Sequence, residues 1–423
     1  MVKIDLRSKL FRSAGIYTLS NILNQAIPFL IMPILTRYLN PTDYGVTATF
    51  QVLVGFVAPF TGLSIQGAIA RKYYDKDSVD LPRYIANCLL ILLVSSFLVG
   101  VVFWIGAHPI STLAVFPQDW LWAVVIVSVC QFVFQVTLTI WQVQSKAARY
   151  GVYQNLLSAL NVGLSLWFVV YLGMNWQGRL WAQILAGGIA GITGLFILWQ
   201  GGWIRPKFDT AYLRSSLAFG IPLIPHAFGG WVMAATDRLF INKMVSVADT
   251  GIYSVGFQLA MVVGLIETSF NTAWVPWLYE KLGERNPETN LKIVKFTYLY
   301  VVGIFIFAIG LALGAPWFLK YFVGKDFRSA GIFIFWLALA RALEAMYYMT
   351  CNYIFYSTRT GFIAFATFFS AIVHIVATYV LIKMNGTVGA AQATVVSSLA
   401  LVILVWWFAA RLHKMPWLLG WSK

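Results

Sequence analysis

The chain has few charged residues: Asp, Glu, Lys and Arg make up 11% of its 423 positions, whereas an average soluble domain carries about 25%. Hydrophobic residues make up 60% of the chain. A soluble protein of this composition would have too few polar side chains to cover its surface. Long apolar runs separated by short polar breaks are typical of a protein that crosses a lipid bilayer many times.

The sequence also lacks the residue patterns of common enzyme and metal chemistry. Its three cysteines, Cys88, Cys130 and Cys351, all lie inside apolar runs, which argues against a disulfide framework in the loops and against a CxxC metal site. It contains neither an HExxH nor a DDxxD motif. One DxD pattern, Asp75-Lys76-Asp77, lies in a short basic loop. That loop is too small for a nucleotide-binding fold, so we interpret it as a solvated loop.

Twelve apolar runs are long enough to cross the membrane as helices. They lie at residues 14–36, 46–69, 84–105, 120–142, 152–172, 180–200, 216–240, 253–276, 296–318, 330–353, 361–382 and 387–409. The tenth run is the least uniform because it contains Arg341 and Glu344. We therefore predict an all-α polytopic membrane protein with twelve transmembrane helices.

The basic residues predict how the chain is oriented in the membrane. A net charge of +15 would suggest nucleic-acid binding in a soluble protein, but here Lys and Arg gather in the loops. An even number of spans places both termini on one side. The loops of that side carry about three times as many Lys and Arg as the opposite loops, so we expect both termini in the cytoplasm. No nucleic-acid partner is expected.

The first half of the chain repeats weakly in the second half. Residues 35–46 align without gaps to residues 241–252. Six spans in each half give both halves the same orientation. We predict two six-helix lobes, residues 1–205 and 206–423, related by a pseudo-twofold axis along the membrane normal, with a substrate path at their interface.

The repeated loop also has a simple structural interpretation. Asp43 and Asp249 stand at equivalent positions just before a new span, where a carboxylate can cap the exposed N–H groups of a helix. Gly45 and Gly251 follow them, and we expect both glycines to be turn residues.

The Asp, Glu, Lys, Arg and His side chains within the predicted spans belong to the second half. The first half has amides there instead, among them Asn24 and Asn161. The second half places seven such residues within or at the ends of spans: His226, Asp237, Arg238, Glu267, Arg341, Glu344 and His374. A charge at mid-bilayer costs about 2.5–3.5 kcal/mol on insertion scales, so these side chains should face a cavity or a partner.

Three of these residues allow both a functional and a structural interpretation. Arg341 and Glu344 are three positions apart on one helix face and can simply pair. Alternatively, Arg341 is the cation that an anionic cargo needs inside the membrane. Glu267 is either buried against Arg341 or a protonation site.

The remaining four have weaker functional signals. Asp237 and Arg238 lie near the end of their span, where long side chains reach the interface at low cost, so an anchoring role is an equal alternative. His226 and His374 are more simply interpreted as hydrogen-bonded polar groups than as proton relays.

Short motifs in a fixed order run from the first predicted span to the last. They are Pro33-Ile34-Leu35-Thr36-Arg37, Pro41-Thr42-Asp43-Tyr44-Gly45, Phe219-Gly220-Ile221-Pro222-Leu223-Ile224-Pro225-His226, Asp237-Arg238-Leu239, Gly251-Ile252-Tyr253-Ser254-Val255, Ala273-Trp274-Val275-Pro276, and Gly386 with Gly389-Ala390-Ala391. Together they resemble Wzx-type polysaccharide flippases of the multidrug/oligosaccharidyl-lipid/polysaccharide (MOP) exporter superfamily. His374 is a departure, because many relatives have a small polar residue such as Asn there.

The resemblance implies two six-helix lobes that form a V in the bacterial inner membrane. It also implies a function: moving an undecaprenyl-diphosphate-linked oligosaccharide from the cytoplasmic to the periplasmic leaflet. The arginines would replace the hydration of the diphosphate, and amides such as Asn24 and Asn161 would bind the sugars. No cofactor is expected, and coupling to protons or to sodium is left open. Membrane lipids are expected partners, with the polysaccharide polymerase and chain-length machinery as further candidates.

Other functions compete with this one. A cation-coupled drug exporter of the same superfamily should have carboxylates in the spans of both halves, and a lipid II flippase would usually have two more spans. A membrane-embedded glycan-processing enzyme is the third alternative, and the DxD pattern is its main support. We expect a transporter rather than an enzyme.

Overall fold

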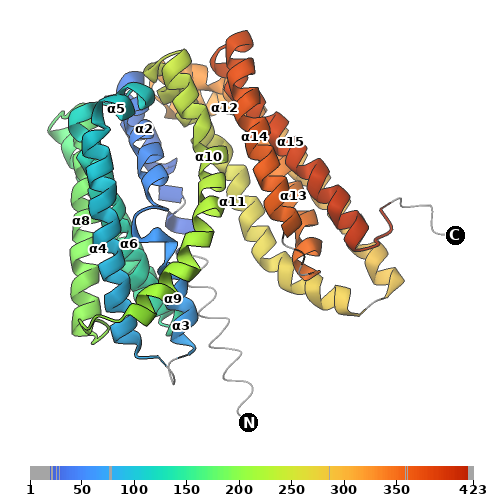
Figure 1. Ribbon diagram of the computed structural model, residues 1–423. Coiled ribbons are helices and arrows are strands. Elements are labelled where there is room, and N and C mark those ends of the chain that lie inside the picture. The colour runs from blue at the N-terminus through green and yellow to red at the C-terminus, as the bar shows by residue number, and fades with distance from the viewer. Residues whose placement is uncertain are drawn as a thin grey trace. The chain divides into compact units, whose positions relative to one another are not determined.

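The computed structural model describes residues 20, 22–24, 26–27, 29–75, 79–284, 286–357, 359 and 361–417, apart from the side chain of His226. Every regular element in this part of the chain is a helix (Figure 1). The chain divides into two compact units, residues 1–231 (unit 1) and 232–423 (unit 2). The division lies inside helix α10, Ile224–Met244. The lobes that we expect at 1–205 and 206–423 remain a prediction.

Unit 1 is arranged around one central helix, α6. Its elements are α2 Pro41–Val57, η1 Gly62–Ser64, α3 Gln66–Tyr73, α4 Leu81–Ile105, α5 Ala107–Ala114, η2 Gln118–Trp120, α6 Leu121–Val143, α7 Ala147–Leu166, the π-helical turn η3 Trp167–Tyr171, α8 Asn175–Gln200, α9 Thr210–Gly220 and η4 Ile221–Leu223. Helix α6 packs against α2, α3, α4, α7 and α8. Ile69, Tyr84 and Phe132 are buried in the core between α3, α4 and α6.

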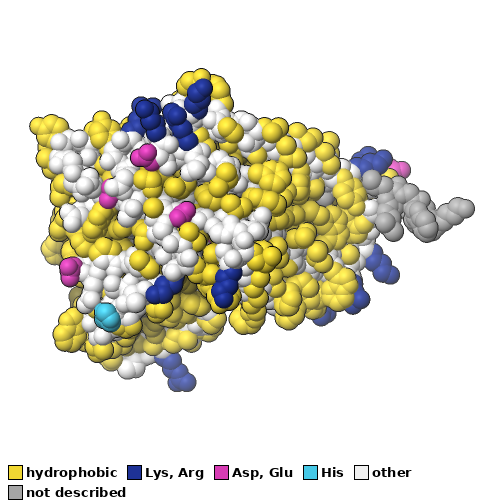
Figure 2. Space-filling view, turned by 90° about the horizontal axis from the view of Figure 1, so that it is seen from above, with side chains coloured by type: hydrophobic (Ala, Val, Ile, Leu, Met, Phe, Trp, Pro, Cys, Tyr) yellow, Lys and Arg dark blue, Asp and Glu magenta, His cyan; other side chains and the backbone are white. Residues whose placement is uncertain are grey.

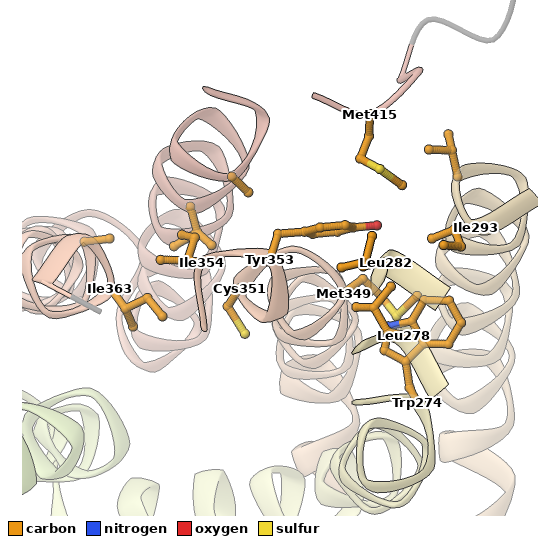
Figure 3. Packing of buried hydrophobic residues seen from close by; sticks show 14 of the residues in the cluster. Trp274, Leu278, Leu282, Ile293, Met349, Cys351, Tyr353, Ile354, Ile363 and Met415 are labelled. Atoms are coloured by element: carbon orange, nitrogen blue, oxygen red, sulfur yellow. The ribbon is translucent and has the colours of Figure 1, made fainter. Parts of the chain in front are cut away.

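Unit 2 is arranged in the same way around α13. Besides the second part of α10, its elements are α11 Val247–Gly283, α12 Pro287–Phe322, η5 Lys325–Ala330, α13 Gly331–Tyr356, α14 Gly361–Asn385 and α15 Thr387–Leu412. Helix α13 packs against α11, α12 and α15, and α14 packs along α15. Figure 3 shows one end of this core, where Trp274 and Leu278 of α11 lie close to Met349 of α13.

The helices have the length and the surface of membrane spans. Eight described helices are long and apolar enough to cross a bilayer, and two bent helix pairs each supply one more candidate. These ten match ten of the twelve predicted runs. The first run, 14–36, is described only in part, and the fifth, 152–172, forms α7 and η3, which are not among the candidates. Only 17% of the apolar window of α12 is buried, as lipid contact requires. Figure 2, seen from above, shows hydrophobic side chains over much of this face, with charged side chains scattered among them.

The second predicted run, 46–69, is not one continuous helix. It breaks between α2 and α3, whose axes differ by 46°. Pro59 lies at the break, where it removes a helical N–H. Gly62 follows with φ +74°, and its N–H donates to Ser95 Oγ at 2.9 Å. This bond satisfies a backbone donor that the break would otherwise leave unpaired in the membrane. A second break occurs where η4 meets α10.

The repeated loop begins a helix in the same way in both units. Asn40 and Ser246 are the N-caps of α2 and α11, and their side chains accept from the backbone N–H groups of Asp43 and Asp249. The aspartates are therefore the third helical residues and not the caps that we expect, although they do stabilise the helix start as partners of the caps. The prediction of turns at Gly45 and Gly251 is wrong, because both glycines lie within the first turns of these helices.

The charged stretch at residues 279–295 is mostly helical. It follows the eighth predicted span, 253–276, and we expect a loop there. Instead, α11 continues to Gly283 and α12 begins at Pro287. Asn286 caps α12 by accepting from the N–H of Glu288 at 2.9 Å. The apolar pattern ends where the helices leave the hydrocarbon, whereas the helices themselves end at a cap, so the pattern places the boundaries too early.

Candidate functional site

Arg341 and Glu344 form an ion pair on α13. Their side chains are one turn apart, and Arg341 Nη1 donates to Glu344 Oε2 at 2.6 Å. Both are partly accessible, since 20% of the Arg341 side chain and 35% of the Glu344 side chain are exposed. The predicted pairing is confirmed. Because neither side chain is sealed in the core, the guanidinium keeps donors that can reach an anion.

Glu267 of α11 lies behind this pair. Its Oε1 is 3.9 Å from Arg341 Nη1, and only 2% of its side chain is exposed. Its Oε2 is buried and has no hydrogen-bond partner among the described residues. The geometry matches the first alternative, burial against Arg341; protonation of Glu267 remains a prediction. One arginine is thus shared by an accessible and a buried carboxylate.

An aromatic ring brings a second arginine to this cluster. Phe257 of α11 has the Arg341 guanidinium 5.3 Å from its ring centroid and the Arg238 guanidinium 4.5 Å from it. Such contacts contribute about 0.5–2 kcal/mol each and hold a cation without neutralising it. We call Arg238, Phe257, Glu267, Arg341 and Glu344 the arginine cluster. The sequence analysis missed Phe257, because an apolar residue in an apolar run carries no signal of its own.

Asp237 and His374 form a different centre. Asp237 Oδ1 lies 3.1 Å from His374 Nε2, and 5% and 0% of these side chains are exposed. The anchoring role that we considered for Asp237 at the membrane interface does not fit a buried side chain. Neighbouring positions on a helix point in different directions, so Asp237 and Arg238 serve two separate groups of residues.

Hydroxyl groups from three helices surround the Asp237–His374 pair. Asp237 accepts from Tyr253 Oη of α11 at 2.6 Å, from Thr394 Oγ1 of α15 at 3.0 Å and from Thr378 Oγ1 of α14 at 3.4 Å. These hydroxyls were not predicted, since their positions in three separate helices give no local pattern.

The two predicted amides of unit 1 have separate surroundings. Asn24 donates to Asn155 Oδ1 at 2.8 Å, whereas Asn161 accepts from Arg179 Nη1 at 2.7 Å. Arg179 also donates to Ser165 Oγ. Arg179 lies one residue before the predicted run 180–200, in the part of α8 that extends beyond this run to Asn175.

Some of the remaining candidate residues belong to neither of these two groups. The side chain of His226 is outside the described residues, as are Lys76 and Asp77 of the DxD pattern. Asp75 pairs with Arg71 at 2.8 Å and with Lys72 at 3.5 Å, and the hydrogen bond from Arg71 lowers the pKa of Asp75. In the described part of the chain, no three His, Cys, Asp or Glu side chains come together as a metal site.

Comparisons with known proteins place the chain in a family. Residues 10–282, well over half of the chain, match the family described as polysaccharide biosynthesis protein. The chain belongs to this family. A similar protein of Haemophilus influenzae, Lsg locus putative protein 1, is 24% identical over 412 residues, which are 96% of this chain and 99% of that protein. A probable low-salt glycan biosynthesis flippase of Haloferax volcanii is 19% identical over 401 residues, 92% of this chain and 81% of that protein.

Solved structures confirm the predicted fold. An inward-facing multidrug resistance MATE family transporter of the MOP superfamily superposes with a TM-score of 0.73 at 16% identity, over 92% of this chain and 94% of that chain. The lipid II flippase MurJ in an inward closed conformation gives 0.72 at 11% identity, over 93% and 87%. This member of the polysaccharide biosynthesis family is therefore an all-α, multi-pass membrane protein with the MOP fold. Family and fold together place it among transporters rather than enzymes.

Proposed function

We propose that this chain is a flippase that carries an undecaprenyl-diphosphate-linked oligosaccharide from the cytoplasmic to the periplasmic leaflet by alternating access. The family supports a function in polysaccharide biosynthesis, and a relative that matches most of the chain is named a glycan biosynthesis flippase. The MOP fold supports transport.

The arginine cluster of unit 2 carries the proposal. A diphosphate is anionic and must pass through a region where charge is expensive. Arg341 and Arg238 present two guanidinium groups around one aromatic ring, and a guanidinium binds phosphate oxygens with paired hydrogen bonds. Because Glu344 is partly exposed beside Arg341, an arriving diphosphate can take its place as the partner of the guanidinium.

The two carboxylates of the arginine cluster also have a role in this mechanism. In the absence of cargo, Glu344 and Glu267 balance the positive charge of Arg341, so the empty site does not hold an unpaired cation in the membrane. A diphosphate that displaces Glu344 leaves Glu267 as the fixed counter-charge. Such an exchange of partners favours binding that is strong enough for capture and weak enough for release.

Deletion of the gene tests the proposed transport step. Loss of a flippase should leave the lipid-linked oligosaccharide complete but stranded on the cytoplasmic leaflet, which leaflet-selective labelling of the glycan measures. Loss of a glycan-processing enzyme would leave it incomplete or unpolymerised. An accessible, full-length glycan on the periplasmic leaflet of the deletion strain would contradict the proposal.

The related transport functions give different results in the same strain. A drug exporter would change the sensitivity of the cell to cationic drugs without changing the surface polysaccharide. A lipid II flippase would block cell-wall synthesis. The expected result for an oligosaccharide flippase is loss of surface polysaccharide alone, and direct association with the polymerase is a further expectation.

The proposed direction of transport depends on the orientation of the chain. The charge distribution supports a cytoplasmic position for both termini and for residues 284–286 between α11 and α12. A reporter fused within 284–286 should therefore be active only as a cytoplasmic fusion. A periplasmic signal from this turn would overturn the orientation and the predicted number of spans.

A further inference from the structure

The Asp237–His374 centre of unit 2 has no part in the cargo site just proposed. It joins four helices, α10, α11, α14 and α15, through side chains that are almost fully buried. Arg238, the residue next to Asp237, directs its guanidinium to Phe257 instead. A buried ionisable pair is energetically costly in a membrane, which favours a functional role for it.

The partners of Asp237 are hydroxyls and an imidazole, whereas the carboxylates of the arginine cluster face a guanidinium. Its two oxygens accept from hydroxyls of Tyr253, Thr378 and Thr394, and His374 is the titratable base against it. The other nitrogen of the imidazole, Nδ1, is 3.0 Å from Ser397 Oγ of α15. One nitrogen of the imidazole thus lies against a carboxylate and the other against a hydroxyl, and a single proton decides the net charge of the whole centre.

That proton changes the centre from charged to neutral. With an imidazolium, the pair carries no net charge; with a neutral imidazole, Asp237 is left as an anion that only hydroxyls and a neutral ring stabilise. An uncompensated charge in such a buried site is strongly disfavoured. The closely packed centre therefore favours the protonated pair, and loss of the proton favours any arrangement that lets water reach Asp237.

A metal ion fits this centre less well than a proton. Hard cations take about six or more oxygen ligands. Here three hydroxyls and the imidazole already surround the carboxylate.

We infer that the Asp237–His374 pair is the proton-binding centre of this transporter, and that its proton occupancy is linked to the packing of α10 and α11 against α14 and α15. The inference rests on the proposed function, because it names the ion that drives export. The proton leaves the imidazolium for water when the helices part and returns when they close. Proton binding and helix packing then bias each other reciprocally.

The groups that face the pair set the conditions for this exchange. Tyr253 is the titratable group from α11 and Arg238 is the charged neighbour on α10, while the facing groups identified on α14 and α15 are hydroxyls. Near neutral pH neither Tyr253 nor Arg238 is expected to change its charge. The pH dependence should therefore belong to His374 with Asp237.

Histidine NMR on the purified full-length chain tests the inference without any cargo. The chain has four histidines, and the His374 signal is the one lost in His374→Gln; His413→Gln should leave it in place. In potassium buffer, we expect this signal to change from the imidazolium to the neutral pattern as pH rises, and to do so at lower pH in Asp237→Asn. Exchange of potassium for sodium at constant pH should leave it unmoved.

Two NMR results would overturn the inference. A His374 signal that shifts on addition of sodium would show a metal site. A signal that stays fixed over the whole pH range in which the chain is folded would show a structural pair. Because the readout involves no cargo, a titrating His374 would stand even if deletion of the gene left the lipid-linked oligosaccharide correctly placed.

Hydrogen exchange tests the link to helix packing. After correction for the intrinsic pH dependence of exchange, backbone amides of α10, α14 and α15 should exchange at least several-fold faster once His374 is neutral. In His374→Gln this extra pH dependence should be absent. Equal behaviour of the wild type and His374→Gln would overturn the proposed coupling.

Discussion

Within the predicted spans of unit 1, amides and hydroxyls bond to one another, whereas the spans of unit 2 pair carboxylates with arginine and histidine. Asn24 bonds to Asn155 in the first unit, and Arg341 pairs with Glu344 in the second. Ion pairs of unit 1 such as Arg83–Asp209 lie at helix starts instead, and Arg179, near the start of α8, bonds to the neutral side chains of Asn161 and Ser165. Neutral hydrogen bonds depend little on pH or on an anionic ligand, while charged pairs respond to both.

The two units nevertheless begin one helix in the same way. Asn40 and Ser246 cap α2 and α11 with the same geometry, and each cap is followed by an aspartate three residues later. Local structure has thus been kept in both halves while the polar interior has diverged. We therefore expect the shared elements to maintain the fold and the charged groups of unit 2 to carry the proposed function.

Removing the carboxylate of the buried pair should have the largest effect. Asp237→Ala leaves His374 without its counter-charge, and breaking a buried pair costs about 3–5 kcal/mol. We expect a clear fall in the melting temperature of the detergent-purified protein and in its membrane abundance. Asp75→Ala, which removes a surface carboxylate of unit 1, is the control and should change neither. Equal melting temperatures of Asp237→Ala and Asp75→Ala would contradict the claim that the buried pair contributes more to stability than the surface pair.

Close packing of α14 against α15 should be the next most sensitive feature. A Cβ atom at Gly389 would lie 2.0 Å from the Leu381 carbonyl oxygen, whereas one at Gly310 of α12 would meet nothing within 4 Å. Gly389→Ala should destabilise unit 2 by about 1–3 kcal/mol, as overpacking does, and Gly310→Ala should be neutral or slightly stabilising. Thermal melting of the two variants measures the difference. An unchanged melting temperature of Gly389→Ala would contradict the close packing of α14 against α15.

A neutral bond of unit 1 should matter least. Asn155→Ala removes the partner of Asn24, which we expect to cost about 1 kcal/mol and to lower export by less than a factor of five. Asn385→Ala, which removes an exposed amide bond to Gln392, is the control and should leave export at its normal level. A loss of export from Asn155→Ala as large as that from a change in the arginine cluster would mean that the amides of unit 1 also bind the cargo.

The sequence predicts the class of fold well because the bilayer imposes a simple rule on it. Apolar runs of about 20 residues mark spans, and ten of them have a counterpart among the described helices. The break at Gly62 and the helical extension of α11 to Gly283 were missed, because backbone hydrogen bonds and caps determine them rather than hydropathy.

The candidate site was predictable only in its local part. Arg341 and Glu344 are one helical turn apart, so their pairing follows from spacing alone. Phe257 and Tyr253 gain their roles through packing between helices, for which a single sequence holds no pattern. Likewise, no sequence pattern predicts that Asp237 Oδ1 and His374 Nε2, from residues 137 positions apart, lie 3.1 Å from each other.

The most direct test of the account is export by variants of Arg341 at matched membrane abundance. Arg341→Ala removes the proposed partner of the diphosphate, and we expect surface polysaccharide to fall by about a hundredfold, corresponding to the loss of two charge-assisted hydrogen bonds. Arg341→Lys keeps the charge without the planar fork and should retain an intermediate level. Arg411→Ala, which removes an exposed arginine of α15, should export normally. Normal surface polysaccharide from Arg341→Ala would contradict the account and reduce the arginine cluster to a structural pair.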